Sequence, residues 1–162
     1  MIVVADTSPI NYMIEIGHVN VLPQLYSRVL VPQRVVEELR DVQAPEKVRT
    51  WMDNLPEWFE VVTCPSHINL SIAHLDPGEQ EAITLSREMH ADYLLVDDMA
   101  ARTAATQLHI QVIGTLGILT RASYHNLLDL PTSLAALQET SFFVAPELIQ
   151  QLLLEDARRK KG

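Results

Sequence analysis

The chain has 162 residues, a length that favours a single domain over 1–162, with the C-terminal helical segment from about residue 146 as an appendage. Acidic residues outnumber Lys and Arg by 21 to 12, and the resulting net charge of −9 argues against a broad basic surface for duplex DNA. The single cysteine excludes an internal disulfide framework and a cysteine-built zinc cage. No membrane span or signal peptide is expected, so we expect a cytoplasmic protein.

The first half of the chain alternates short apolar runs with amphipathic stretches. Strands are predicted over 2–5 (IVVA), 28–31 (RVLV) and 59–62 (FEVV). Helices are predicted from Ser8 to about 16, from about 20, over 32–39 and over 45–54. Ser8 is expected to cap the first of these helices, because Pro9 follows at the first helical position. Residues 65–75 have mixed polarity and are expected to form a loop.

The second half begins with a strong helix start, Asp76-Pro77-Gly78-Glu79, which combines a cap, a proline and an acid three residues after the cap. Further strands are predicted over 93–96 (YLLV), 110–113 (IQVI) and 142–145 (FFVA). Further helices are predicted over 76–90, 98–108, 116–124, 131–139 and 146–159. Strands that alternate with helices predict an α/β fold with a mainly parallel sheet covered by helices on both faces.

Aspartates follow two of the predicted strands. Asp6 comes directly after the IVVA strand, and Asp97 and Asp98 come directly after the YLLV strand. Ligands of parallel sheets bind at the carboxyl ends of the strands, and neighbouring strands lie about 4.8 Å apart. If these two strands are neighbours, their aspartates can share one metal ion. Capping of the next helix is the alternative interpretation, and it applies most strongly to Asp98.

Two glutamates can be ranked by their angle around a helix, at 100° per residue. In the 32–39 helix, Glu38 borders the apolar face, whereas Glu37 points to solvent. In the helix from 76, Glu79 falls on the buried side. Glu79 is also the third residue of a capping box, and its side chain can serve both roles through different oxygen atoms.

Several other polar residues have both a functional and a structural interpretation. Thr7 and Ser8 can contact a phosphate or a metal-bound water, although capping is the alternative for Ser8. Arg102 can contact a phosphate or form an i,i+4 ion pair with Asp98. Thr115 lies at a glycine-flanked helix start that can present N–H groups to a phosphate. Two tryptophans, at 51 and 58, favour core packing over a base-stacking platform.

Five segments in order resemble the PIN-domain nucleases, in particular a bacterial branch related to VapC-type toxins. They are VADTSPI (4–10), VPQRVVEEL (31–39), LDPGEQEAITLS (75–86), LLVDDMAARTAA (94–105) and VIGTLGILTRA (112–122). Each segment alone is weak, but all five in the expected order cover most of the chain. The resemblance implies a three-layer α/β/α sandwich with a central, mainly parallel sheet.

The resemblance also implies divalent-metal-dependent hydrolysis of phosphodiester bonds in single-stranded or structured RNA. The family's acidic set falls on Asp6, Glu38, Glu79 and Asp97, with Asp98 as an accessory metal ligand. Thr7, Ser8, Arg102 and Thr115 are the candidates for substrate binding. Hard oxygen ligands select Mg²⁺ or Mn²⁺. This chain departs from the VapC pattern in its third acidic segment, where Glu79 within DPGE stands in place of the usual aspartate.

The expected role is the toxin of a type II toxin–antitoxin pair, with RNA as substrate and a cognate antitoxin as partner. VapC-like relatives commonly pair, and this chain has apolar stretches at 124–130 and 148–154, so we expect a homodimer. A catalytically silent PIN-like module that binds RNA or protein is the alternative. A response-regulator receiver also clusters aspartates on an α/β fold, but here the paired aspartates come late and the last strand leads into Gly114-Thr115.

Overall fold

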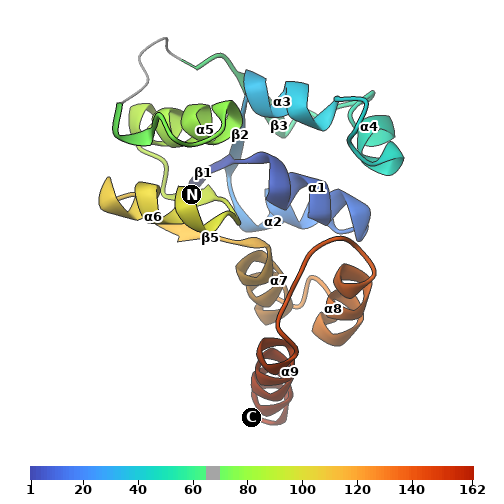
Figure 1. The fold of residues 1–162 in the computed structure, drawn as a ribbon. Helices are drawn as coiled ribbons and strands as arrows, with labels where there is room; N and C mark the ends of the chain where they lie inside the picture. Colours follow the sequence, from blue (N-terminus) through green and yellow to red (C-terminus); the bar gives the residue numbers. More distant parts are fainter. Residues whose placement is uncertain (65–69) are drawn as a thin grey trace.

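A computed structural model of the chain describes residues 1–64 and 70–162 (Figure 1). Within these residues one sheet contains β1 (Ile2–Ala5), β2 (Arg28–Pro32), β3 (Phe59–Val62), β4 (Tyr93–Leu95) and β5 (Val112–Ile113). All neighbouring strands pair in parallel, in the order β3-β2-β1-β4-β5. The parallel central sheet that the sequence predicts is therefore confirmed.

Helices cover both faces of this sheet. The α-helices of the described residues are α1 (Thr7–Glu15), α2 (Leu22–Leu25), α3 (Gln33–Leu39), α4 (Glu46–Trp51), α5 (Pro77–Glu88), α6 (Met99–Gln107), α7 (Thr115–Tyr124), α8 (Leu130–Gln138) and α9 (Pro146–Lys161). Short 3₁₀ helices, η1 (Val19–Val21) and η2 (Leu70–Ile72), occur in two connections.

Alternate side chains of the strands point to opposite faces and build two apolar cores. Val3 and Val29 belong to a core that includes side chains of α1, α3, α4 and α7. Val4 and Leu30, one residue further along, belong to a second core that includes side chains of α5 and α6. The result is the three-layer α/β/α arrangement that the resemblance implies.

The strand order reverses between β1 and β4, and this reversal determines where ligands can bind. The chain builds β1, β2 and β3 outward in one direction, and then returns to place β4 on the other side of β1. The pairing of β1 and β4 continues one residue past β1, because the Asp6 N–H donates to the Leu95 carbonyl at 2.9 Å. Doubly wound sheets bind ligands at such a reversal, at the carboxyl ends of the strands. A receiver-type sheet has the order 2-1-3-4-5, so this order excludes the receiver alternative.

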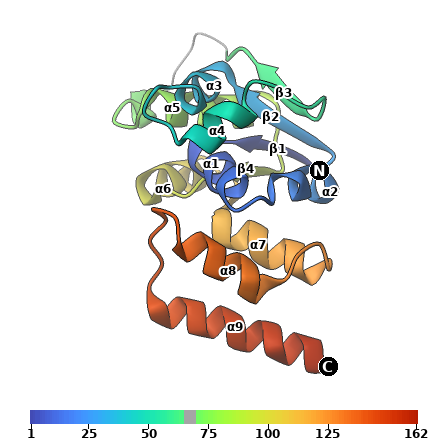
Figure 2. The same ribbon diagram turned by 90° about the vertical axis from the view of Figure 1, so that its right-hand side faces the viewer.

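The three last helices stack beyond the β5 edge of the sheet. Figures 1 and 2 show α7, α8 and α9 in succession, with α9 outermost and the C-terminus at its far end. Ile149 anchors α9 to the first core, and the buried carboxylate of Asp156 accepts hydrogen bonds from Ser123, Arg159 and Lys160. No helix in the described ranges is long and apolar enough to cross a membrane.

Two local predictions are wrong in part. Residues 142–145 form no strand; the ring of Phe142 packs edge-on against Tyr12 of α1, where no strand is available for pairing. The predicted loop over 65–75 contains η2, while its residues 65–69 lie outside the described residues. The aromatic run therefore connects α8 to α9 as irregular chain, and this connection reaches the site described next.

Candidate functional site

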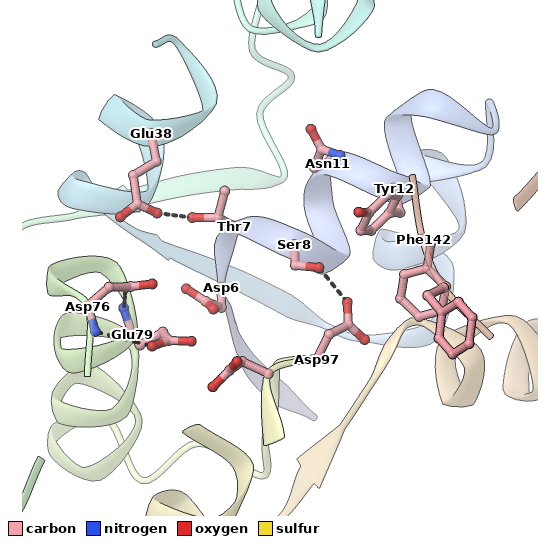
Figure 3. Close-up of a pocket in the computed structure, with 12 residues that line it drawn as sticks. Asp6, Thr7, Ser8, Asn11, Tyr12, Glu38, Asp76, Glu79, Asp97 and Phe142 are labelled. Carbon is pink, nitrogen blue, oxygen red and sulfur yellow. Dashed lines mark hydrogen bonds between the residues drawn. The ribbon is translucent and has the colours of Figure 1, made fainter. Parts of the chain in front are cut away.

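A pocket of about 740 Å³ opens beside the carboxyl ends of β1 and β4. It is lined by Asp6, Thr7, Ser8, Asn11, Tyr12, Glu38, Asp76, Glu79, Asp97, Asp98, Phe142 and Phe143. Figure 3 shows the acidic side chains converging from four places in the chain: the end of β1, α3, the start of α5 and the segment after β4. The structure thus brings together all five acids that the sequence singles out.

Asp6 is the most deeply placed acid of the pocket. It is only 5% exposed, and its Oδ1 atom is buried without a hydrogen-bond partner. The backbone places Asp6 at the N-cap position of α1, but its side chain accepts no capping hydrogen bond. The predicted cap, Ser8, is wrong, because α1 begins at Thr7 and the Ser8 hydroxyl donates to Asp97 Oδ2 at 2.7 Å (Figure 3). The Asp6 carboxylate is therefore available to the pocket.

Glu38 is fixed from two sides. The Thr7 hydroxyl donates a hydrogen bond to Glu38 Oε2 (Figure 3). A Cβ atom on Gly78 would lie 2.6 Å from each carboxylate oxygen of Glu38, so the carboxylate can occupy this position against the start of α5 because residue 78 is glycine. Glu37, in contrast, is exposed, and its Oε2 atom lies 3.7 Å from Arg34 Nη1. The helical angles predicted this difference between the two glutamates.

Asp76 and Glu79 form the capping box of α5. The Glu79 N–H donates to Asp76 Oδ1 at 2.8 Å, and the Asp76 N–H donates to Glu79 Oε1 at 3.2 Å. The box uses one oxygen of each carboxylate, so the other oxygen of Glu79 is left for the pocket. This agrees with the expectation that Glu79 serves both roles through different oxygen atoms. The sequence predicts only a capping role for Asp76, but Asp76 also lines the pocket. The reciprocal hydrogen bonds of a capping box indicate this, because they hold both acids at the same end of the helix.

Asp97 is held by neighbours on both sides. Its Oδ1 accepts the Thr115 N–H, and its Oδ2 accepts the hydroxyls of Thr115 and Ser8, all at 2.7 Å. Thr115 is 0% exposed, so it supports Asp97 and does not reach a substrate as the sequence suggested. Asp98 caps α6 by accepting the Ala101 N–H at 3.0 Å, and it also lines the pocket.

Burial and mutual repulsion raise the pKa values of three acids in the pocket. Burial raises the pKa of Asp6 well above its ordinary value, against the lowering effect of the Thr7 N–H, and the charges of the neighbouring acids add to the rise. Burial also raises the pKa of Glu38, which the Thr7 hydroxyl partly offsets. For Glu79, burial and the charges of Asp76 and Asp98 raise the pKa to about 7. The cluster is thus short of positive charge.

Arg102 is the predicted phosphate contact. The structure contains neither the i,i+4 ion pair with Asp98 nor another hydrogen bond or ion pair from the Arg102 guanidinium to the described residues; the Arg102 backbone N–H donates to the Asp98 carbonyl within α6. A Cβ atom on Gly114 would lie 2.7 Å from Arg102 Nη1 and 2.9 Å from Asp97 Oδ1. Arg102 therefore extends toward the Asp97 side of the site with its guanidinium unpaired.

The far end of the pocket is aromatic, and sequence reasoning missed it. Tyr12 and Phe142 pack edge-to-face with ring centroids 4.9 Å apart (Figure 3), and Phe143 lines the pocket next to them. Asn11 also lines the pocket; it lies about one turn after Thr7 and Ser8 on α1, so helical periodicity could have identified it. Nothing local to residues 142 and 143 indicates that they reach α1.

The donor set fits a divalent cation, although no three Asp, Glu, His or Cys side chains of the described residues are already arranged around one point. The unpaired buried oxygen of Asp6 and the raised pKa values show negative charge that the protein itself does not neutralise. Carboxylate oxygens are the ligands that Mg²⁺ and Mn²⁺ prefer.

Comparisons with known proteins bear on the family and the fold of the chain. A family model described as PIN domain matches residues 2–157. Among solved structures, the fold is similar to that of a PilT N-terminus domain protein from the hyperthermophilic archaeon Sulfolobus solfataricus P2, with a TM-score of 0.50 and 17% identity over 90% of this chain and 100% of that one. That likeness concerns the fold alone. No curated protein sequence matches significantly.

Proposed function

The chain belongs to the PIN-domain family, and on this premise we propose that it is a divalent-metal-dependent endoribonuclease that hydrolyses RNA phosphodiester bonds. PIN domains are generally nucleases, and they generally use divalent metals. The observation that carries the proposal is the convergence of Asp6, Glu38 and Glu79 on one pocket with a buried, unpaired Asp6 oxygen. Such uncompensated acids in a cleft are typical of a site that needs a cation.

Four acids would hold Mg²⁺ or Mn²⁺: Asp6, Glu38, Glu79 and Asp97, with Asp98 as an accessory. The chemistry that the cation supplies is neutralisation of charge at the phosphate and activation of a water nucleophile. Ser8 and Thr115 hold the Asp97 carboxylate in place, and Thr7 does the same for Glu38. These hydroxyl groups thus orient the acids.

Proton balance follows from the raised pKa values. Without a cation, the pKa of about 7 leaves Glu79 partly protonated near neutral pH, which relieves repulsion from Asp76 and Asp98. Cation binding favours the ionised acids, so it releases protons and becomes stronger as the pH rises. Arg102, unpaired beside Asp97, is placed to attract a phosphate of the RNA.

We also propose that the protein is the toxin of a type II toxin–antitoxin pair and acts in the cytoplasm. A cognate antitoxin would place a basic side chain among the uncompensated acids of the pocket. For the homodimer, the supporting observation is an apolar pocket of about 550 Å³ between α7 and α9, beside the exposed side chains of Tyr124 and Leu148. Light scattering on wild-type protein and on Leu148→Glu tests the dimer; a monomeric wild type at micromolar concentration contradicts it.

A catalytically silent PIN-like module is the second candidate. Two observations favour it: both oxygens of Asp97 already accept hydrogen bonds, and the described residues lack a preformed cage of three ligands. The two candidates differ in tight metal binding, because a silent module has no need for it.

The test is a matched pair of substitutions on α3, Glu38→Gln and Glu37→Gln. Calorimetric titration with Mn²⁺ and cleavage of a labelled RNA oligonucleotide, each with EDTA controls, are measured for both variants. We expect Glu38→Gln to weaken Mn²⁺ binding about 10- to 100-fold and to reduce cleavage, with Glu37→Gln unchanged. Absence of Mn²⁺ binding and cleavage in the wild type overturns the proposed function and favours the silent module. Equal effects of the two variants overturn the role of Glu38.

A further inference from the structure

The most exposed large apolar side chain of the described residues lies in the pocket itself. Phe143 is 87% exposed, and it lines the same pocket as the acids. An aromatic ring left in water at the mouth of a polar pocket makes no contribution to the core. The aromatic residues that sequence reasoning considered, Trp51 and Trp58, are packed against each other and against the first core instead.

The aromatic end of the pocket is attached to the acidic end through α1. Phe142 packs edge-to-face on Tyr12, and the Tyr12 hydroxyl shares a hydrogen bond of 2.9 Å with the Ser141 hydroxyl. The same helix begins directly after Asp6 and carries Thr7 and Ser8 in its first turn. Figure 3 shows Tyr12 and Phe142 on one side of Asp97, with Glu38 and Asp76 on the other. The segment that carries Phe143 is therefore held at a defined distance from the acids.

The charge of the pocket does not favour the binding of a nucleic acid. The chain has a net charge of −9, and among the described residues the pocket is lined by six acids and by no lysine or arginine. A cation bound by the acids would offset only part of this charge at one phosphate, and Arg102 adds one more positive group. The rest of the affinity must come from a contact that does not depend on charge. An exposed aromatic ring supplies one, because every base presents a π-face.

We propose that Phe143 stacks on an unpaired base of the RNA bound at this pocket and so positions the strand against the acids. The inference rests on the proposed nuclease function and adds a substrate-positioning residue to it. In a duplex the base faces are covered by their neighbours, so a paired strand cannot offer a face to Phe143. Phenylalanine has no polar group to read base edges, so the contact tolerates any base.

The test uses binding as its readout, separate from cleavage. A single-stranded RNA carrying 2-aminopurine at successive positions is titrated with full-length protein in the Asp6→Asn background, and fluorescence quenching reports stacking. Phe143→Ala is compared with Val42→Ala, a matched loss of an exposed apolar side chain outside the pocket. Phe143→Trp retains an aromatic face, and Phe143→Leu retains apolarity without one.

We expect Phe143→Ala to weaken binding of single-stranded RNA about 10-fold and to abolish quenching at one position of the oligonucleotide. Phe143→Trp should retain both signals, Phe143→Leu should lose the quenching, and Val42→Ala should match the parent. Duplex RNA should bind weakly and equally to all variants. The effect should persist as salt increases, because stacking is not a charge interaction.

Failure of this inference differs from failure of the proposed function. Wild-type protein that cleaves RNA with Mg²⁺ while Phe143→Ala binds and cleaves like wild type overturns the stacking role alone. That outcome is also expected if Phe143 is a docking residue for a protein partner. Equal losses for single-stranded and duplex RNA overturn stacking on an unpaired base as the role of Phe143. Wild-type protein that neither binds nor cleaves RNA overturns both.

Discussion

Two buried aspartates in this molecule have the same exposure and opposite surroundings. Asp6 and Asp156 are each 5% exposed. Asp156 accepts hydrogen bonds from Ser123 and Arg159 and pairs with Lys160 at 2.7 Å, and it fastens α9 to α7. Asp6 has a buried oxygen with no partner, and its charged neighbours are acids.

The pKa values respond to this difference. Burial raises the pKa of both groups, but hydrogen bonds from Lys160, Arg159 and Ser123 outweigh it and bring the pKa of Asp156 below its ordinary value. Within the part of the chain that the structure describes, no positive group compensates Asp6, and burial raises its pKa. Buried carboxylates are normally paired, so burial by itself does not mark a functional site. Burial without compensation does, because the fold then tolerates a repulsion that a bound ligand can relieve.

The largest expected effect separates the two aspartates by activity. Asp6→Asn should reduce metal-dependent RNA cleavage roughly 10³-fold or more, because it removes a charged ligand worth several kcal/mol to the reaction. Asp156→Asn should retain cleavage per folded molecule and lose about 1–3 kcal/mol of stability, because Arg159 and Lys160 lose a charged acceptor. Cleavage assays and chemical denaturation of both variants, with Asp53→Asn as an exposed control, measure this. Near wild-type turnover of Asp6→Asn under saturating Mg²⁺ refutes a role for Asp6.

The next effect tests how closely the acidic pocket is packed. Gly78→Ala places a Cβ atom 2.6 Å from both oxygens of Glu38, so the carboxylate must leave the position in which it accepts the Thr7 hydroxyl. The displaced atoms are the end of a flexible side chain, so the fold should persist while Mn²⁺ affinity falls about 10-fold. In the double variant Gly78→Ala/Glu38→Asp, the shorter acidic side chain leaves room for the new Cβ atom. This variant should therefore recover part of the Mn²⁺ affinity. Unchanged Mn²⁺ affinity of Gly78→Ala would show that Glu38 is not needed in its present position.

A third effect is visible in stability alone. Below its ordinary pKa of 4.5, Glu79 is protonated whether the protein is folded or unfolded, and above about pH 7 it is ionised in both states. Between these limits the folded protein binds more protons, so its free energy of unfolding should fall as the pH rises. Asp156, with a lowered pKa, should destabilise the protein only as the pH falls through its folded-state pKa.

Thermal unfolding in EDTA from pH 5 to 7.5 checks these signs. The wild type should lose about 2–4 °C across this window, which corresponds to roughly 1 kcal/mol for a chain of this size. Glu79→Gln should flatten the slope, and Asp156→Asn should leave it unchanged. Added Mn²⁺ should reduce the slope, because the cation replaces the protons. A wild-type slope of the opposite sign contradicts the raised pKa values in the pocket.

The parts of the site that local periodicity governs were predictable from the sequence. The helical angle placed Glu38 inward and Glu37 outward, and the spacing of the DPGE segment predicted the capping box of Glu79. The strand-end rule brought Asp6 and Asp97 together, because β1 and β4 are neighbours. Each of these inferences depends on the periodicity of a strand or a helix, or on the rule that the carboxyl ends of parallel strands meet at one edge of the sheet.

The parts that long-range contacts govern were not predictable. Ser8 has the sequence of a helix cap, but Asp97, 89 residues later, takes its hydroxyl. The short apolar run at 142–145 resembles a strand, but Tyr12, 130 residues earlier, holds Phe142 against α1. A side chain's local preference is worth about 1 kcal/mol, so a single well-placed tertiary contact can override it.

The smallest expected effect concerns Arg102, whose guanidinium and the Asp97 carboxylate both lie within 3 Å of where a Cβ on Gly114 would be. Arg102→Ala should weaken RNA binding several-fold in a cleavage-dead Glu79→Gln protein with Mg²⁺ at low salt, and the difference should shrink as salt screens the charge. Arg87→Ala, at an exposed position in the last turn of α5, removes the same charge outside the pocket and should have less effect. RNA affinity across a salt series measures this. If Arg102 serves only the fold, its loss lowers the unfolding temperature and leaves RNA affinity intact. Affinity that does not depend on Mg²⁺ would locate the RNA on another surface, such as the basic residues at 158–161.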